Sequence, residues 1–148
     1  MEVGRKKQKL YIGIPRETEF QEQRVALVPE SVGLLVANGH RVVIESNAGK
    51  NANFSDNEYS ESGAEIIHDT QEIYKADIIL KISPPSEEEI KMMKYKQILF
   101  SALQLSAQPK STLKKLMEKK ITAIAWDYIE DESGSFPIVR SMLSLIHI

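Results

Sequence analysis

The chain has 148 residues, of which 42% are hydrophobic and 27% charged, with a net charge of −2 and no cysteine. This length predicts one domain with a real core, and the composition excludes a disordered chain and gives no reason to expect a nucleic-acid partner. The lack of cysteine excludes disulfides, a thiolate nucleophile and a cysteine-based zinc site, and it fits the cytoplasm as the expected location.

The first elements are expected close to the N-terminus. Residues 1–8 are predicted to be a disordered basic tail, because no second basic cluster supports a nucleic-acid arm. An apolar run predicts a strand over 10–14. A helix is expected over 29–37, since it has proline in its first turn and Asn38-Gly39 after its last apolar residue.

Apolar runs then alternate with helical patterns along the rest of the chain. Strands are expected at 41–45, 64–67, 77–82, 97–103 and 121–125. Helices or helical turns are expected from a cap at Asp56 to Tyr59, from a cap at Thr70, over 87–93 after a cap at Ser86, and over 110–119 with Leu113, Leu116 and Met117 on the apolar face. This alternation predicts a mostly parallel sheet with helices on both faces.

In such a sheet ligands bind beyond the carboxyl ends of the strands, so the loops after the strands matter most. The loop over 15–28 is polar and contains Arg24, which lies at the border of an apolar segment. Its guanidinium can hold a carboxylate through two parallel hydrogen bonds. The alternative is a surface ion pair with Glu22 or Glu30.

Three more residues have chemistry that the pattern leaves open. Lys81 lies inside an apolar run, so it either points into a cleft or is an edge lysine whose stem covers apolar surface. Gln104 follows the strand over 97–103, and its amide can bind a carbonyl or carboxylate without exchanging a proton. His40 follows a turn, which indicates a structural imidazole. The histidines lack metal-ligand spacing, and no G-x-G-x-x-G occurs, so neither a metal nor a dinucleotide cradle is expected.

Three stretches near the N-terminus are similar to a known family. They are Ile-Gly-Ile-Pro-Arg-Glu at 12–17, Arg-Val-Ala-Leu-Val-Pro at 24–29 and the segment 35–42. They resemble the start of alanine dehydrogenase and of the α subunit of proton-translocating NAD(P) transhydrogenase. The resemblance covers residues 9–142, and it implies an α/β, flavodoxin- or Rossmann-like parallel sheet that is the N-terminal substrate domain of a two-domain dehydrogenase. The resemblance also implies that an NAD-binding domain lies outside this chain, and residues 143–148 are expected to be the aberrant tail of a truncated product.

The resemblance also implies roles for single residues. Arg24 matches the arginine that grips the substrate carboxylate, and Met142 matches a methionine that lines the same pocket. Two positions depart from alanine dehydrogenase, because Ser83 stands at its substrate-binding lysine and Gln104 at its catalytic histidine. No catalytic residue is therefore intact. Lys81 shares a strand face with residue 83, which makes it a candidate for the role of the missing lysine.

Three functions follow as hypotheses. In the first, the full protein is a homo-oligomer that converts L-alanine, water and NAD to pyruvate, ammonia and NADH, and this chain alone is inactive. In the second, it is the transhydrogenase α subunit, which works with membrane subunits. Pro84-Pro85 and Gln104, which stands in place of the histidine, favour that hypothesis, whereas 136–142 favours alanine dehydrogenase. In the third, the chain is a non-catalytic binding module.

Overall fold

The computed structural model describes residues 8–128 of the chain. The expectations for the N-terminal tail, for Met142 and for the segment 143–148 fall on residues outside this range, so they stay predictions. Within residues 8–128 no helix has both the length and the apolar character that crossing a bilayer requires.

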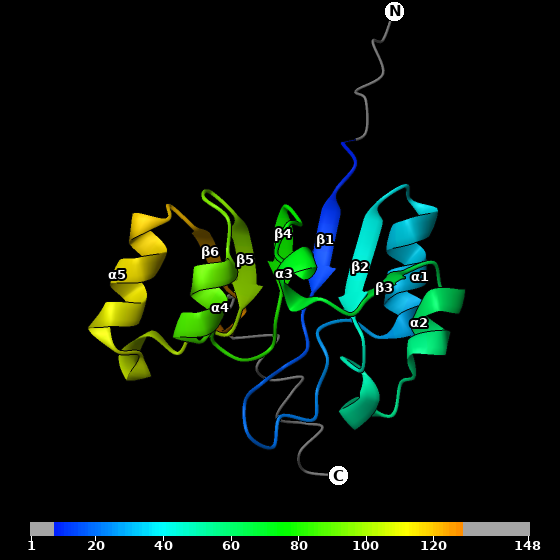
Figure 1. Cartoon of the computed structure of the whole chain (residues 1–148), viewed down its shortest axis with the longest axis horizontal. Helices are drawn as coiled ribbons and strands as arrows, with labels where there is room; N and C mark the ends of the chain where they lie inside the picture. The colour runs from blue at the N-terminus through cyan, green and yellow to red at the C-terminus, as the bar shows by residue number, and fades with distance from the viewer. Residues whose placement is uncertain (1–7, 129–148) are drawn as a thin grey trace, which may run out of the picture.

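Six strands form one sheet, and every neighbouring pair in it is parallel. The strands are β1 (Tyr11–Ile14), β2 (Arg41–Glu45), β3 (Glu65–Ile67), β4 (Ile78–Leu80), β5 (Ile98–Ser101) and β6 (Thr122–Ala125). Their order is β3-β2-β1-β4-β5-β6, so the strand order reverses between β1 and β4 (Figure 1). The predicted parallel sheet is confirmed, and of the two related architectures the order is that of the Rossmann sheet.

Helices cover both faces of the sheet, as predicted (Figure 1). They are α1 (Pro29–Ala37), α2 (Asp56–Glu61), α3 (Thr70–Ile73), α4 (Glu87–Met92) and α5 (Lys110–Glu118), with short 3-10 turns η1 (Lys50–Ala52), η2 (Leu105–Ala107) and η3 (Trp126–Tyr128). Val32 of α1 and Tyr59 of α2 pack with Ile12 in one core. Ile79 and Leu99 pack on the other face, against α3, α4 and α5. Alternate strand residues therefore enter opposite cores, which is why the central strands β1, β4 and β5 are mostly apolar.

Two helix caps differ from the prediction by one residue. Ser55, and not Asp56, caps α2, because its hydroxyl accepts the Glu58 N–H while the Glu58 carboxylate accepts the Ser55 N–H. Asp69, and not Thr70, caps α3 by accepting a backbone N–H two residues later. In both cases the side chain just before the first helical residue takes the cap. The predicted cap of α4 by Ser86 is confirmed.

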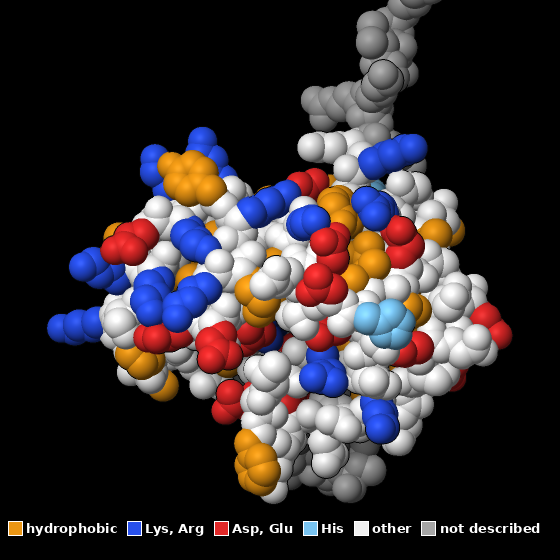
Figure 2. Space-filling model, in the orientation of Figure 1, with side chains coloured by type: hydrophobic (Ala, Val, Ile, Leu, Met, Phe, Trp, Pro, Cys, Tyr) orange, Lys and Arg blue, Asp and Glu red, His pale blue; other side chains and the backbone are white. Residues whose placement is uncertain are grey.

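The apolar face of α5 is narrower than predicted. Leu116 is buried in the core, whereas Met117 is 77% exposed. The helix is held instead by Lys119, whose ammonium donates to the carbonyl oxygens of Ile90, Lys91 and Met93 at 2.7–2.8 Å. Lysines gather over α4 and α5 in Figure 2. The Lys119 ammonium places a positive charge at the carbonyl end of α4, where the helix dipole favours a cation.

Close packing at the centre of the sheet depends on Gly13 of β1. A Cβ at this position would lie 2.7 Å from the Ile73 carbonyl oxygen and 2.9 Å from Cβ of Ala76. The α3 turn therefore rests directly on the β1 backbone. This contact fixes β1 beside β4, where the strand order reverses and a ligand site is expected.

Candidate functional site

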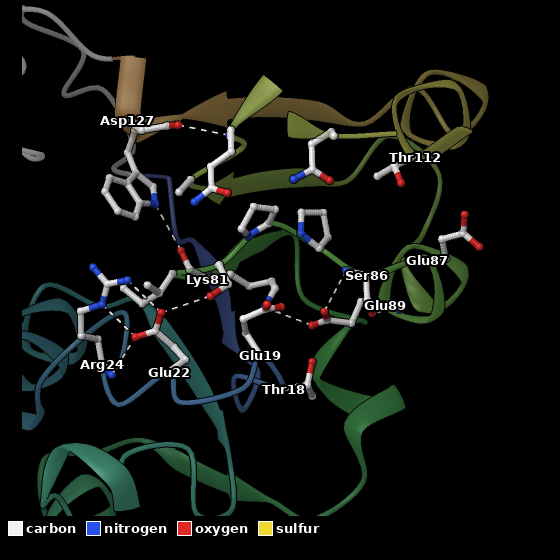
Figure 3. Close-up of a pocket in the computed structure, with 18 residues that line it drawn as sticks. Thr18, Glu19, Glu22, Arg24, Lys81, Ser86, Glu87, Glu89, Thr112 and Asp127 are labelled. Atoms are coloured by element: carbon white, nitrogen blue, oxygen red, sulfur yellow. Dashed lines mark hydrogen bonds and ion pairs between the residues drawn. The ribbon is translucent and has the colours of Figure 1, made fainter. Parts of the chain in front are cut away.

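A cavity of about 560 Å³ lies at the carboxyl ends of β4 and β5, next to the loop that follows β1 (Figure 3). Arg24, Lys81, Ser83 and Gln104 all line it. The structure thus brings together four of the five residues that the sequence singled out, from segments up to 80 positions apart. The fifth, Met142, lies outside the described residues.

Arg24 forms one of the ion pairs considered from the sequence and also lines the cavity. Its Nε and Nη2 each donate to one carboxylate oxygen of Glu22, both at 2.8 Å. The Arg24 side chain is 50% exposed, whereas that of Glu22 is only 9% exposed. The hydrogen bonds from Arg24 lower the pKa of Glu22, and the same contact raises the pKa of Arg24. The pair therefore stays doubly charged across the neutral range.

Lys81 is a buried cation between two buried carboxylates. Its Nζ lies 3.2 Å from Glu17 Oε1 and 3.1 Å from Glu89 Oε2, and its side chain is 1% exposed. The Tyr74 hydroxyl donates to the same Glu89 oxygen at 3.0 Å. Burial raises the pKa of Glu17 even though the Lys81 charge lowers it. Of the two possibilities for Lys81, the structure shows the one in the wall of the cleft. The carboxylates of Glu17 and Glu89 already balance its charge there.

Glu17 also ties the loop after β1 to the end of β4. Its Oε1 accepts the backbone N–H of Ile82 at 3.1 Å and that of Ser83 at 2.8 Å. Strand β4 ends at Leu80 and not at residue 82 as predicted, and the two N–H groups that follow Lys81 donate to the Glu17 side chain. A carboxylate in a dry site is stabilised by such donors and by the adjacent ammonium.

Glu17 and Glu89 are site residues that the sequence analysis missed. The Ser86-x-x-Glu89 spacing is a visible capping box, and Glu89 does cap α4. Glu17 comes two residues after Pro15, just beyond the carboxyl end of the first strand, which is also visible in the sequence. What the sequence does not contain is the tertiary contact that makes both of them partners of Lys81.

Gln104 is presented to the cavity by a strained turn. Its φ of 45° and ψ of 52° lie in the left-handed region, which costs a residue with a Cβ about 1–2 kcal/mol. Asp127 stabilises this turn, since its carboxylate accepts the N–H groups of Leu103 at 3.1 Å and Gln104 at 3.2 Å. Such strain concentrates at functional sites. The amide that results can hydrogen-bond a ligand but cannot transfer a proton near neutral pH.

The first strand-to-helix turn does not fit a dinucleotide. The Arg16 N–H donates to Glu45 Oε2 at 2.7 Å, and the Thr70 hydroxyl donates to Glu45 Oε1 at 2.6 Å. The Glu45 carboxylate thus joins the loop after β1 to the start of α3, and the turn after β1 has no G-x-G-x-x-G sequence.

Among residues 8–128 no group of three or more His, Asp or Glu side chains is placed to hold a metal ion. His40 has a structural role, as expected, because its Nδ1 accepts the Leu10 N–H at 3.1 Å. The site is a polar cavity in whose wall the side chains of Arg24 and Lys81 form ion pairs with carboxylates.

Comparison with known proteins gives the same family that the sequence resembles. The family model described as "Alanine dehydrogenase/PNT, N-terminal domain" matches residues 13–146. Alanine dehydrogenase of Staphylococcus epidermidis is 37% identical over 131 residues, which cover 88% of this chain and 35% of that protein. Alanine dehydrogenase of Methanococcus maripaludis is 38% identical over 134 residues, which cover 90% of this chain and 36% of that protein.

Solved structures agree with the sequence matches. A structure titled L-alanine dehydrogenase superposes with a TM-score of 0.85 at 36% identity, covering 88% of this chain and 36% of that one. A transhydrogenase from Sinorhizobium meliloti superposes with a TM-score of 0.75 at 27% identity, covering 82% of this chain and 35% of that one. The chain spans about a third of the length of the relatives it matches. It therefore belongs to the alanine dehydrogenase/PNT family, whose N-terminal domain it carries.

Proposed function

We propose that the chain is the substrate-binding domain of an NAD-dependent, alanine dehydrogenase-like oxidoreductase. In this proposal Arg24 binds the carboxylate of alanine or pyruvate at the mouth of the cavity. The observation that carries it is the half-exposed Arg24 side chain in the cavity wall at the carboxyl ends of the strands, in a family whose relatives include alanine dehydrogenases. An arginine is the side chain best suited to a carboxylate.

The proposed reaction converts L-alanine, NAD and water to pyruvate, ammonium, NADH and a proton. The residues described here form no NAD cradle, so NAD binding is assigned to a part of the protein outside this chain, and none of the hydride chemistry is assigned to these residues. The chain's own part is to hold the carboxylate at Arg24 and to contact the substrate through the Gln104 amide. A cytoplasmic homo-oligomer is proposed for the whole protein on the same resemblance.

In this proposal no other residue takes over the role of the lysine that the family has where Ser83 stands in this chain. Lys81 lines the cavity, but two carboxylates lie within 3.2 Å of its ammonium, and its side chain is only 1% exposed. Binding a substrate carboxylate would require Lys81 to give up a buried partner, which is costly. Lys81 is therefore assigned to the cavity wall, and Arg24 is the cation assigned to the substrate.

The second candidate is the α subunit of a proton-translocating transhydrogenase, which would act with membrane subunits. Gln104 favours it, because an amide in place of a histidine supplies no acid or base for amino-acid oxidation. The similarity to a transhydrogenase structure supports it as well. In this candidate hydride passes between two nicotinamide nucleotides, and pyruvate has no role.

Two measurements test the proposal. Pyruvate titrated into the ¹⁵N-labelled chain should shift backbone signals around the cavity, and Arg24→Lys should weaken that binding about tenfold. In a protein that contains this chain and an NAD domain, NADH oxidation should depend on pyruvate and ammonia. Hydride exchange between nucleotides without any response to pyruvate would favour the transhydrogenase. Micromolar binding of NADH by the 148-residue chain itself would contradict the assignment of NAD to another domain.

A further inference from the structure

Glu22 forms hydrogen bonds with both Arg24 and Ser83 in the wall of the cavity. One of its carboxylate oxygens accepts from Arg24 Nε and the other from Arg24 Nη2, at 2.8 Å each. The second oxygen also accepts the Ser83 hydroxyl at 3.2 Å. The first also accepts the backbone N–H of Arg24 at 3.0 Å. Figure 3 shows Glu22 alongside Arg24 in the cavity wall.

These contacts hold the guanidinium in one orientation. A bidentate carboxylate fixes the plane of an arginine fork, and the Glu22 side chain that provides it is 9% exposed and therefore itself held by its surroundings. Half of the Arg24 side-chain surface nevertheless remains exposed. An arginine held this way loses less rotamer entropy when a ligand binds, because much of it is already lost in the free protein.

We propose that Glu22, braced by the Ser83 hydroxyl, is a positioning residue that orients Arg24 for the substrate carboxylate. The inference deepens the proposed function and rests on the proposed role of Arg24. It also gives Ser83 a role, because a hydroxyl can donate to Glu22 without competing with Arg24 for it. A lysine at position 83 would instead place a second cation beside the same carboxylate.

The sign of one substitution separates this role from a simple charge effect. Glu22 brings a negative charge into a site that binds an anion, so by charge alone its removal should strengthen pyruvate binding. If Glu22 orients Arg24, its removal should weaken binding, because the guanidinium loses the two hydrogen bonds to Glu22 that fix its plane. The two roles therefore predict opposite changes in affinity.

The experiment compares Glu22→Gln with Glu19→Gln in pyruvate titrations of the ¹⁵N-labelled chain. Glu19 lines the same cavity, and among the described contacts its carboxylate does not pair with Arg24, so it controls for the loss of one charge. We expect Glu22→Gln to weaken binding about threefold, the size typical of a partly exposed pair, and Glu19→Gln to leave it equal or tighter. Equal or tighter binding by Glu22→Gln would overturn the inference.

A second readout does not depend on the ligand. The Arg24 Nε–H signal should be sharp and slow to exchange with solvent, and it should change as acid protonates Glu22, whose pKa lies below 4.5. In Glu22→Gln that transition should vanish, and Ser83→Ala should move it to higher pH. An Nε–H signal that is the same in wild type and Glu22→Gln would overturn the inference. If the wild-type chain binds no pyruvate, the role of Arg24 falls, even where the Nε–H data show the contact.

Discussion

Replacing Lys81 with methionine should strongly destabilise the fold at neutral pH. Lys81 is the cation between Glu17 and Glu89, and all three side chains are at most 6% exposed. Methionine keeps the length of the side chain and removes its charge, so the two carboxylates remain together in a dry site. A buried charge that loses its partner is one of the costliest changes a protein can undergo.

The expected cost is about 3–5 kcal/mol at pH 7. An independent figure comes from Glu17, which can escape the penalty by taking up a proton. With the ordinary glutamate pKa of 4.5, protonating Glu17 at pH 7 costs about 3.4 kcal/mol, because pH 7 lies about 2.5 pH units above that pKa. At pH 5 the cost is only about 0.7 kcal/mol. Both routes give a loss of a few kcal/mol, which is a large part of the stability of a domain of this size.

The pH dependence of the loss has a definite sign. In the variant the folded pKa of Glu17 lies further above its unfolded value, because burial raises it and Lys81 no longer lowers it. A carboxyl group whose pKa is raised by folding costs nothing below its unfolded pKa and destabilises increasingly as the pH rises above it. The difference between variant and wild type should therefore be small near pH 4.5 and grow towards pH 7.

The assay is urea unfolding of the wild-type chain and Lys81→Met at pH 7 and pH 5, followed by circular dichroism. The matched control is Lys75→Met, which removes the exposed Lys75–Glu72 pair. That pair is shorter, at 2.6 Å, yet its loss should barely change the midpoint, because both side chains are solvated. A Lys81→Met variant that matches this control, or whose loss does not shrink at pH 5, would refute the reasoning.

Three further predictions concern the core and the site. Gly13→Ala should cost about 2–3 kcal/mol, because its Cβ would press against the Ile73 carbonyl, and an unchanged melting midpoint would contradict the close contact. Tyr59→Phe should cost about 1–2 kcal/mol in urea unfolding, because the hydroxyl donates to a backbone carbonyl at 2.7 Å; a cost near zero would show that water replaces it. Gln104→His should raise pyruvate-dependent NADH oxidation roughly a hundredfold in a protein that contains this chain, because it supplies a group that can carry a proton, and no gain would indicate another substrate.

Local sequence signals predicted most of the fold. The helix α1 and the strand β2 have the predicted bounds, because Pro29 and Asn38-Gly39 mark the helix ends and the β-branched run 42–44 is short and well bounded. The errors are also local, since Ser55 and Asp69 take caps predicted one residue later. Strand ends that depend on side chains from elsewhere could not be predicted, and the early end of β4 is an example.

The site was predictable as a set of positions but not as a set of contacts. The rule that ligands bind at the carboxyl ends of parallel strands was enough to select Arg24, Lys81 and Gln104. It could not show that Lys81 is neutralised, because Glu17 lies 64 positions away along the chain. The role of Glu22 was visible only as one of two possible ion pairs.

The bond between Glu17 and the Ser83 N–H spans 66 positions of the chain, and it has a consequence for the order of folding. Strand β1 pairs with β2 on one side and with β4 on the other, so the N-terminal part of the sheet can form before β4 arrives. Contacts between distant segments form late, because a large loop must close first. The cavity wall therefore forms only when the two halves of the sheet join. A chain that stopped folding before that point would have part of its core but no binding site.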